Sequence, residues 1–150
     1  MKIPVDIHVH AERLGAEQLR RGENEQPETE DYRVSGIMKK TSDGYRIEYQ
    51  EENDVFFTTI DTFYDNTVSL NRIGPINTHM VFADGKTHTC ICNTGYYPLH
   101  MRVRTKSLDN SLTMDGGRLK ISYSVEIVGN LAERSRLEIS VSPDASILKS

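Results

Sequence analysis

The chain has no tryptophan and no long run of apolar residues. A membrane-spanning helix needs about 20 consecutive apolar residues, and no segment comes near that length. The first ten residues alternate apolar and polar side chains, so they lack the continuous apolar stretch of a signal peptide. We therefore expect a cytoplasmic protein with no membrane partner.

Basic charge is also scarce, because 18 Lys and Arg residues stand against 22 Asp and Glu, for a formal net charge of -4. A nucleic-acid-binding protein needs a basic face that replaces phosphate counterions, so no nucleic-acid partner is expected. Only two cysteines occur, Cys90 and Cys92, and their spacing on a predicted strand points both the same way. That pair is poorly placed to cross-link the fold, which favours reduced thiols in the cytoplasm.

Sequence motifs for cofactor chemistry are missing as well. The chain contains no phosphate-binding P-loop, no GxGxxG and no GxSxG. We therefore expect no cofactor and assign no catalytic residue.

Alternation with a period of two fills most of the sequence, and it is typical of strands with one buried face. Turn signals such as Ser42-Asp43-Gly44 and Asp84-Gly85 separate the alternating runs. The pattern predicts about ten short strands and at most one helix, at residues 11–21. Residues 22–30 and 107–116 are predicted to be polar connections.

Ten strands without helical crossovers predict an all-β fold, an antiparallel up-and-down meander. Closure into a barrel of about eight to ten strands is the simplest way to hide the two edges. The length of 150 residues suits one domain. We expect residues 1–150 to form a single β-barrel with a long variable loop or short helix at about residues 11–29.

Arg72 is the unusual position, because it shares a strand face with Val68 and Leu70. A guanidinium in an apolar setting needs a partner. Three interpretations stay open: a salt bridge that closes the barrel, an anchor for an anionic ligand head group, or a position at the rim with neither role. Glu51 and Glu52 are the candidate protein partners, and with Asp54 they are interpreted as a solvated rim rather than an acid–base pair.

Two histidine-containing motifs resemble metal sites. Asp6-x-His8-x-His10 resembles the metal-binding opening of the amidohydrolases, but that fold needs a barrel of roughly 250 residues. His88-x-Cys90-x-Cys92 places three potential ligands on one strand face, but a closed zinc site needs a fourth. We interpret the first motif as an outward polar face and the second as small residues facing a neighbouring element. Metal binding at either motif stays open, and we assign no metal ligands.

Several short motifs follow one another in a characteristic order. They are Gly36, Tyr49-x-Glu51-Glu52, Arg72-x-Gly74, Met80-x-Phe82, Thr94, Leu99-x-Met101, Thr105-x-x-Leu108 and Gly117-x-Leu119-x-Ile121-x-Tyr123. Together they resemble the YwiB-like bacterial proteins, a domain of unknown function. The segment between His10 and Thr29 is longer than usual in that family, and Gly95 and Tyr97 replace its proline and glycine. The resemblance implies a calycin-type, lipocalin-like β-barrel in a bacterial cytoplasm, and it implies no activity.

A barrel of this size is wide enough for one small ligand or for side chains alone. We expect a non-enzymatic binder of a small apolar or amphipathic ligand in the barrel mouth. The alternative is a structural or protein-interaction module with a solidly packed barrel, for example a homodimer; a metal-dependent hydrolase is a distant third. The predicted ligand-binding residues are Arg72, Glu51, Met80, Phe82, Met101 and Tyr123.

Overall fold

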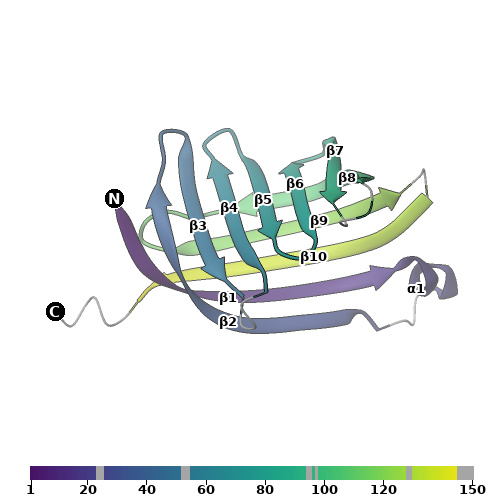
Figure 1. The fold of residues 1–150 in the computed structure, drawn as a ribbon, viewed down its shortest axis with the longest axis horizontal. Coiled ribbons are helices and arrows are strands. Elements are labelled where there is room, and N and C mark those ends of the chain that lie inside the picture. Colours follow the sequence, from purple (N-terminus) through teal and green to yellow (C-terminus); the bar gives the residue numbers. More distant parts are fainter. Residues whose placement is uncertain (23–25, 52–54, 94–95, 97, 128–129, 145–150) are drawn as a thin grey trace.

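The computed structural model describes residues 1–22, 26–51, 55–93, 96, 98–127 and 130–144. It contains ten strands and one short helix within these residues (Figure 1). The elements are β1 (Lys2–Gly15), α1 (Ala16–Arg21), β2 (Glu28–Lys40), β3 (Gly44–Gln50), β4 (Phe57–Phe63), β5 (Thr67–Ile73), β6 (Asn77–Ala83), β7 (Thr87–Asn93), β8 (Pro98–Asn110), β9 (Gly117–Ile127) and β10 (Asn130–Pro143).

The ten strands form one closed antiparallel barrel. Each strand pairs with its neighbours in the chain, and β1 also pairs with β10, which closes the barrel. Closure leaves no strand unpaired along a whole edge, although β2 pairs with β3 only from Gly36 to Lys40. The prediction of an all-β, up-and-down barrel is confirmed.

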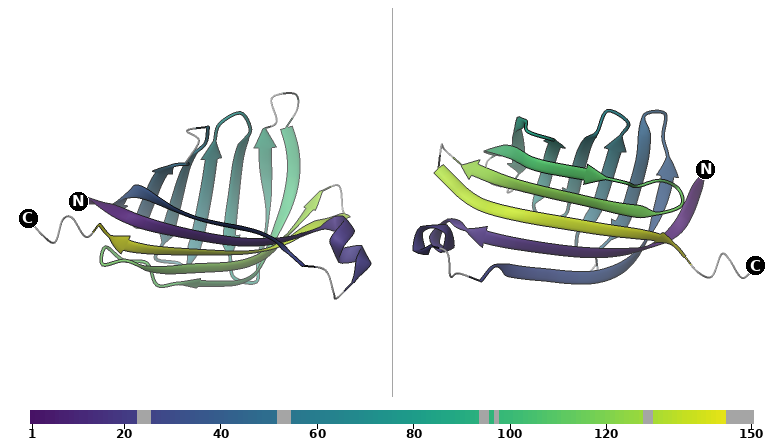
Figure 2. Two further views of the ribbon diagram at one scale, coloured as in Figure 1. Left: turned by 90° about the horizontal axis from the view of Figure 1, so that it is seen from below. Right: turned by 180° about the vertical axis from the view of Figure 1, so that it is seen from behind.

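The strands are of two lengths, which the prediction of ten short strands did not anticipate. β1, β2, β8, β9 and β10 have 11 to 14 residues, whereas β3 to β7 have 7 each. The long strands run along the long axis of the molecule, and the short strands cross it (Figures 1 and 2). The barrel is therefore built from a wall of long strands and a wall of short ones.

The segment predicted as a long variable loop or short helix at about residues 11–29 is strand at both of its ends. Residues 11–15 continue β1, and α1 covers only Ala16–Arg21. The segment has helix-forming composition, but it pairs with β2 on one side and β10 on the other. Two ladders of backbone hydrogen bonds override the weak local preference. No helix among the described residues is long and apolar enough to cross a membrane.

The polar connection predicted at residues 107–116 is also wrong in its first part, because β8 continues to Asn110. A β-bulge lies between Thr105 and Ser107 where β8 pairs with β9. The bulge places Lys106 and Ser107 both on the outside and turns Leu108 inward. An extra residue of this kind shifts the alternation of inward and outward side chains by one position. The period-two pattern in the sequence therefore breaks at Lys106, although the strand continues to Asn110.

One end of the barrel interior is packed solid with apolar side chains. Phe82 is 0% exposed, and its ring lies 4.8 Å from the ring of Tyr123, measured between centroids. Side chains this closely packed leave no room for a ligand. Other apolar side chains of this end with at most 1% exposure are Val5, Ile7, Met38, Ile47, Ile60, Val68, Val103, Leu119 and Ile121.

Candidate functional site

The opposite end of the barrel is hollow. A cavity of about 390 Å³ lies inside the mouth, which is formed by the second half of β1, the start of β10 and the adjoining strand ends. This volume lies in the range of small-molecule sites. The barrel is therefore not solidly packed at this end. Its apolar lining includes Val9, Leu70, Met80, Met101, Val125, Ile127 and Leu137.

Arg72 and Glu51 form a two-pronged ion pair on the wall of this cavity. Arg72 Nε donates to Glu51 Oε1 at 2.9 Å, and Arg72 Nη2 donates to Glu51 Oε2 at 2.8 Å. Thr58 Oγ1 donates to the same carboxylate at 3.2 Å. The Glu51 side chain is only 15% exposed, against 41% for Arg72. Of the three interpretations of Arg72, the structure shows the salt bridge.

The guanidinium of Arg72 is held on a second side by an aromatic ring. Its Cζ lies 3.7 Å from the centroid of the Phe56 ring, which is a cation–π contact. The hydrogen bonds to Glu51 raise the pKa of Arg72, with burial opposing the shift. The group is therefore a permanent cation with a fixed position.

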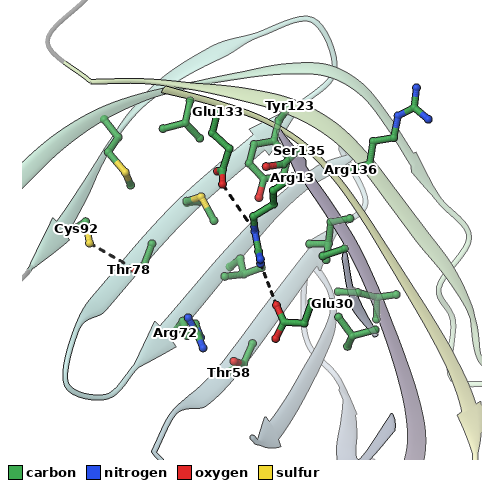
Figure 3. A pocket seen from close by; sticks show the side chains of 18 of the residues that line it. Arg13, Glu30, Thr58, Arg72, Thr78, Cys92, Tyr123, Glu133, Ser135 and Arg136 are labelled. Carbon is green, nitrogen blue, oxygen red and sulfur yellow. Dashed lines mark hydrogen bonds and ion pairs between the residues drawn. The ribbon is translucent and has the colours of Figure 1, made fainter. Parts of the chain in front are cut away.

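A second cluster of charged side chains lies at the mouth, on the wall of long strands. Arg13 Nη2 donates to Glu30 Oε2 at 3.1 Å, and Arg13 Nε lies 3.8 Å from Glu133 Oε1 (Figure 3). The register explains the meeting, because Arg13 pairs with Glu28 of β2 and with Ser135 of β10. Glu30 and Glu133 each lie two residues from these partners, on the same inner face.

Three tyrosines, Tyr32, Tyr49 and Tyr123, place hydroxyl groups along the mostly apolar wall of the cavity. The hydroxyls of Tyr32 and Tyr49 lie 3.1 Å apart, which is a hydrogen-bond distance. Burial is the main reason that the pKa values of Tyr32, Tyr49 and Tyr123 are raised. All three phenols therefore stay protonated at neutral pH and can donate or accept a hydrogen bond.

Five of the six predicted ligand-binding residues line the cavity: Arg72, Glu51, Met80, Met101 and Tyr123. Phe82 does not line it. The ring lies in the packed core below, two residues along β6 from Met80 on the same inner face.

Arg13, Glu30 and Glu133 were missed by the sequence reasoning. Arg13 lay in the segment predicted as a loop or short helix, Glu30 in a predicted loop, and Glu133 before the last predicted strand. A signal did exist, because Arg13 continues the alternation of Val9 and Ala11, which are both buried. Following that period past the first polar residues would have extended the strand.

The Asp6-x-His8-x-His10 motif faces outward, as predicted, and Asp6 is not the residue that joins the histidines. Asp31 of β2 lies between them, 2.9 Å from His8 Nε2 and 2.7 Å from His10 Nδ1. His10 Nε2 also lies 3.4 Å from Glu12. This is a hydrogen-bonded surface cluster on the outer face of the long-strand wall.

The His88-x-Cys90-x-Cys92 motif lies on the inner face of β7. Cys90 is buried in the core, whereas Cys92 lines the cavity with its sulfur 3.6 Å from Thr78 Oγ1. Both thiols are free. Within the described residues, no group of three His, Cys, Asp or Glu side chains is arranged to hold a metal ion. Of the predicted acidic rim, Glu52 and Asp54 lie outside the described residues.

Comparisons with known proteins agree on a family. Residues 16–139 match the domain of unknown function DUF1934. The crystal structure of the ywiB protein from Bacillus subtilis resembles this fold with a TM-score of 0.77. The similarity covers 95% of this chain and 93% of that one at 18% sequence identity. No curated protein matches the chain. The predicted resemblance is confirmed, and the chain belongs to the DUF1934 family.

Proposed function

We propose that the protein is a non-enzymatic binder of a small amphipathic molecule, which it holds in the barrel mouth. The observation that carries this proposal is the cavity of about 390 Å³, whose apolar wall is bordered by two ion-pair groups. A chain or ring of the ligand would displace water from Leu70, Met80 and Met101. Its polar group would meet the charges and phenols.

The composition of the lining supports binding over catalysis. Thr58, Thr78, Cys92 and Ser135 are the described cavity residues that carry a hydroxyl or thiol of the kind used as a nucleophile. Such a group needs a neighbouring base, usually histidine. No histidine is found among the described residues that line the cavity. An apolar cavity with a few fixed polar groups is the usual form of a small-molecule site.

Native mass spectrometry of the protein purified from its own host tests the proposal. We expect a bound small molecule that is released by organic solvent and is identified by its mass. Protein that carries no small molecule from the host, and takes none up from a total lipid and metabolite extract, would contradict the proposal.

A matched pair of variants locates the bound molecule. Leu70→Trp places an indole in the cavity, whereas Asn71→Trp places the same ring on the outer face of the same strand. We expect the first variant to lose the molecule and the second to keep it. Equal loss in both would show that binding does not occur in the mouth.

A further inference from the structure

We propose that the polar group of the ligand is a cation, so that the mouth takes an amphipathic amine rather than a fatty acid or a phosphate ester. This inference rests on the proposed function and adds the chemical class of the ligand. Three observations support it. Carboxylates outnumber the arginines that face the cavity, both of these arginines are already paired with carboxylates, and carboxylates lie near the three tyrosine hydroxyls.

Carboxylates outnumber guanidiniums on the inner wall. The described lining contains Glu30, Glu51 and Glu133 and three arginines, Arg13, Arg72 and Arg136. Arg136 is exposed, and Figure 3 shows its guanidinium pointing away from the other labelled side chains, so the charged groups that face the cavity leave a charge of -1. A cation would balance the surplus, whereas an anion would add to it.

Arg72 is poorly available to an anionic ligand. Glu51 takes one edge of its guanidinium with two hydrogen bonds, and Phe56 covers a face. An anion that displaced Glu51 would leave a carboxylate that is 15% exposed without its partner. An unpaired, largely buried charge is strongly unfavourable. An anion at the free edge would lie close to Glu51 and be repelled by it.

Glu133 is the carboxylate with the weakest partner. Arg13 makes its short contact with Glu30, at 3.1 Å, and lies 3.8 Å from Glu133, beyond normal hydrogen-bond distance. Within the described residues no hydrogen bond to the Glu133 carboxylate is found. Glu133 is therefore the acceptor that an ammonium group would use.

The charged groups around the three phenols of the cavity also show a surplus of negative charge. Burial is the largest cause of their raised pKa values, and the charged neighbours add to it. Glu51 and Glu30 both raise the pKa of Tyr32. For Tyr49 the effect of Glu51 outweighs that of Arg72, and for Tyr123 the effect of Glu133 outweighs that of Arg13. At each phenol a carboxylate thus acts more strongly than any arginine, and the electron-rich rings also attract cations.

Three molecules with one chain and different head groups test the charge preference. They are decylamine, decanol and decanoate, each titrated below its micelle concentration at neutral pH and followed by calorimetry. Circular dichroism in parallel confirms that the barrel stays folded. We expect decylamine to bind about tenfold more tightly than decanol, and decanoate to bind more weakly than decanol.

Two glutamine variants test the role of Glu133. Glu133→Gln removes the surplus charge, and Glu138→Gln removes a carboxylate from the outer face of the same strand, where it pairs with Arg118. We expect Glu133→Gln to lower the affinity for decylamine about tenfold and to leave decanol unchanged. Glu138→Gln should change neither.

The outcomes separate this inference from the proposed function. If decanoate binds as tightly as decylamine, the cationic preference is overturned, and a binding function for the mouth still stands. If both glutamine variants weaken decylamine equally, the cation does not bind at Glu133, and the inference fails. If none of the three molecules binds and no small molecule is carried from the host, the proposed function fails with it.

Discussion

At one end of the barrel Phe82, Ile47 and Ile60 fill the interior completely, whereas at the other end charged and aromatic side chains surround a cavity of about 390 Å³. The boundary between the two ends falls within single strands. It lies between inward-facing residues that are two positions apart. Val68 is in the core and Leu70 lines the cavity, and Phe82 and Met80 differ in the same way. Strands with the same alternation therefore produce a solid end and a hollow end.

The difference comes from the kind of side chain that occupies the inward positions. At the packed end these positions are apolar and can fill space at the density of a protein interior. At the mouth they include Arg13, Glu30, Glu51 and Arg72. Arg13, Glu30 and Arg72 keep between 41% and 47% of their side chains exposed, and the more buried Glu51 is paired with Arg72. Charged groups cannot fill an apolar interior without losing their hydration, so we expect these pairs to keep the mouth open.

Truncation of Phe82 and of Met80 is the strongest way to test this contrast. Phe82→Ala empties a packed site, and we expect it to lower the free energy of unfolding by about 3–5 kcal/mol. Met80→Ala enlarges an existing cavity, and we expect a loss of about 1 kcal/mol. Urea denaturation measures both values. Equal losses would mean that the two ends are packed alike.

Breaking the ion pair at the mouth should have the next largest effect. Glu51→Gln leaves the Arg72 cation without its counter-charge, and we expect a loss of about 1–2 kcal/mol because Arg72 is 41% exposed and partly hydrated. The double variant with Arg72→Met should recover part of this loss. A double-mutant cycle on the free energy of unfolding gives the coupling.

The comparison pair for this cycle is Arg118 and Glu138, which lie 3.3 Å apart on the outer face of β9 and β10, with side chains 55% and 39% exposed. We expect a coupling there of less than about 0.5 kcal/mol, because exposed ion pairs contribute little. A larger coupling for the outer pair than for Arg72 and Glu51 would argue against a role of the inner pair in holding the mouth.

Most of the fold could be predicted because its signals are local. Period-two alternation and turn residues are read within a few positions, and closure follows from the need to cover strand edges. The length of β8 was missed because the bulge between Thr105 and Ser107 reverses the phase of the pattern. The end of β1 was missed because its pairing with β10 connects residues from opposite ends of the chain.

The site was predicted only in part, for a related reason. Arg72 was found because a charge among apolar neighbours on one strand is visible in the sequence. Its partner Glu51 was named, but the choice between a salt bridge and a ligand anchor depended on the distance between two strands. Arg13 and Glu30 come from strands that are neighbours in the chain, but Glu133 joins them only when β10 pairs with β1 and closes the barrel. That last meeting has no local sequence signal.

Cys90 and Cys92 provide a chemical probe of the boundary between the two ends. Burial raises the pKa of Cys90 and encloses its thiol, whereas Cys92 lines the cavity. We expect iodoacetamide to alkylate Cys92 well before Cys90, as measured by peptide mass spectrometry. A ligand in the mouth should protect Cys92. Equal rates, or no protection by a ligand shown to bind, would place the boundary elsewhere.

The surface cluster of His8, His10 and Asp31 should have the smallest effect, because all three side chains are exposed to solvent. Hydrogen bonds from His8 and then His10 lower the pKa of Asp31 below 3.8. The hydrogen bond to Asp31, followed by that to Glu12, raises the pKa of His10 above 6.5. The contribution of Asp31 to stability is present above its unfolded pKa and is lost as the pH falls through the folded value. The contribution of His10 is present below 6.5 and is lost as the pH rises through its raised value.

Both contributions are therefore fully present together between about pH 4 and pH 6.5 and decline outside that range. Asp31→Asn removes the shared acceptor, and we expect the pKa of His10 to return toward 6.5 in an NMR titration, with little change in the thermal unfolding temperature. A large fall in unfolding temperature with Asp31→Asn would mean that the outer face of the long-strand wall stabilises the barrel as strongly as the ion pair inside its mouth.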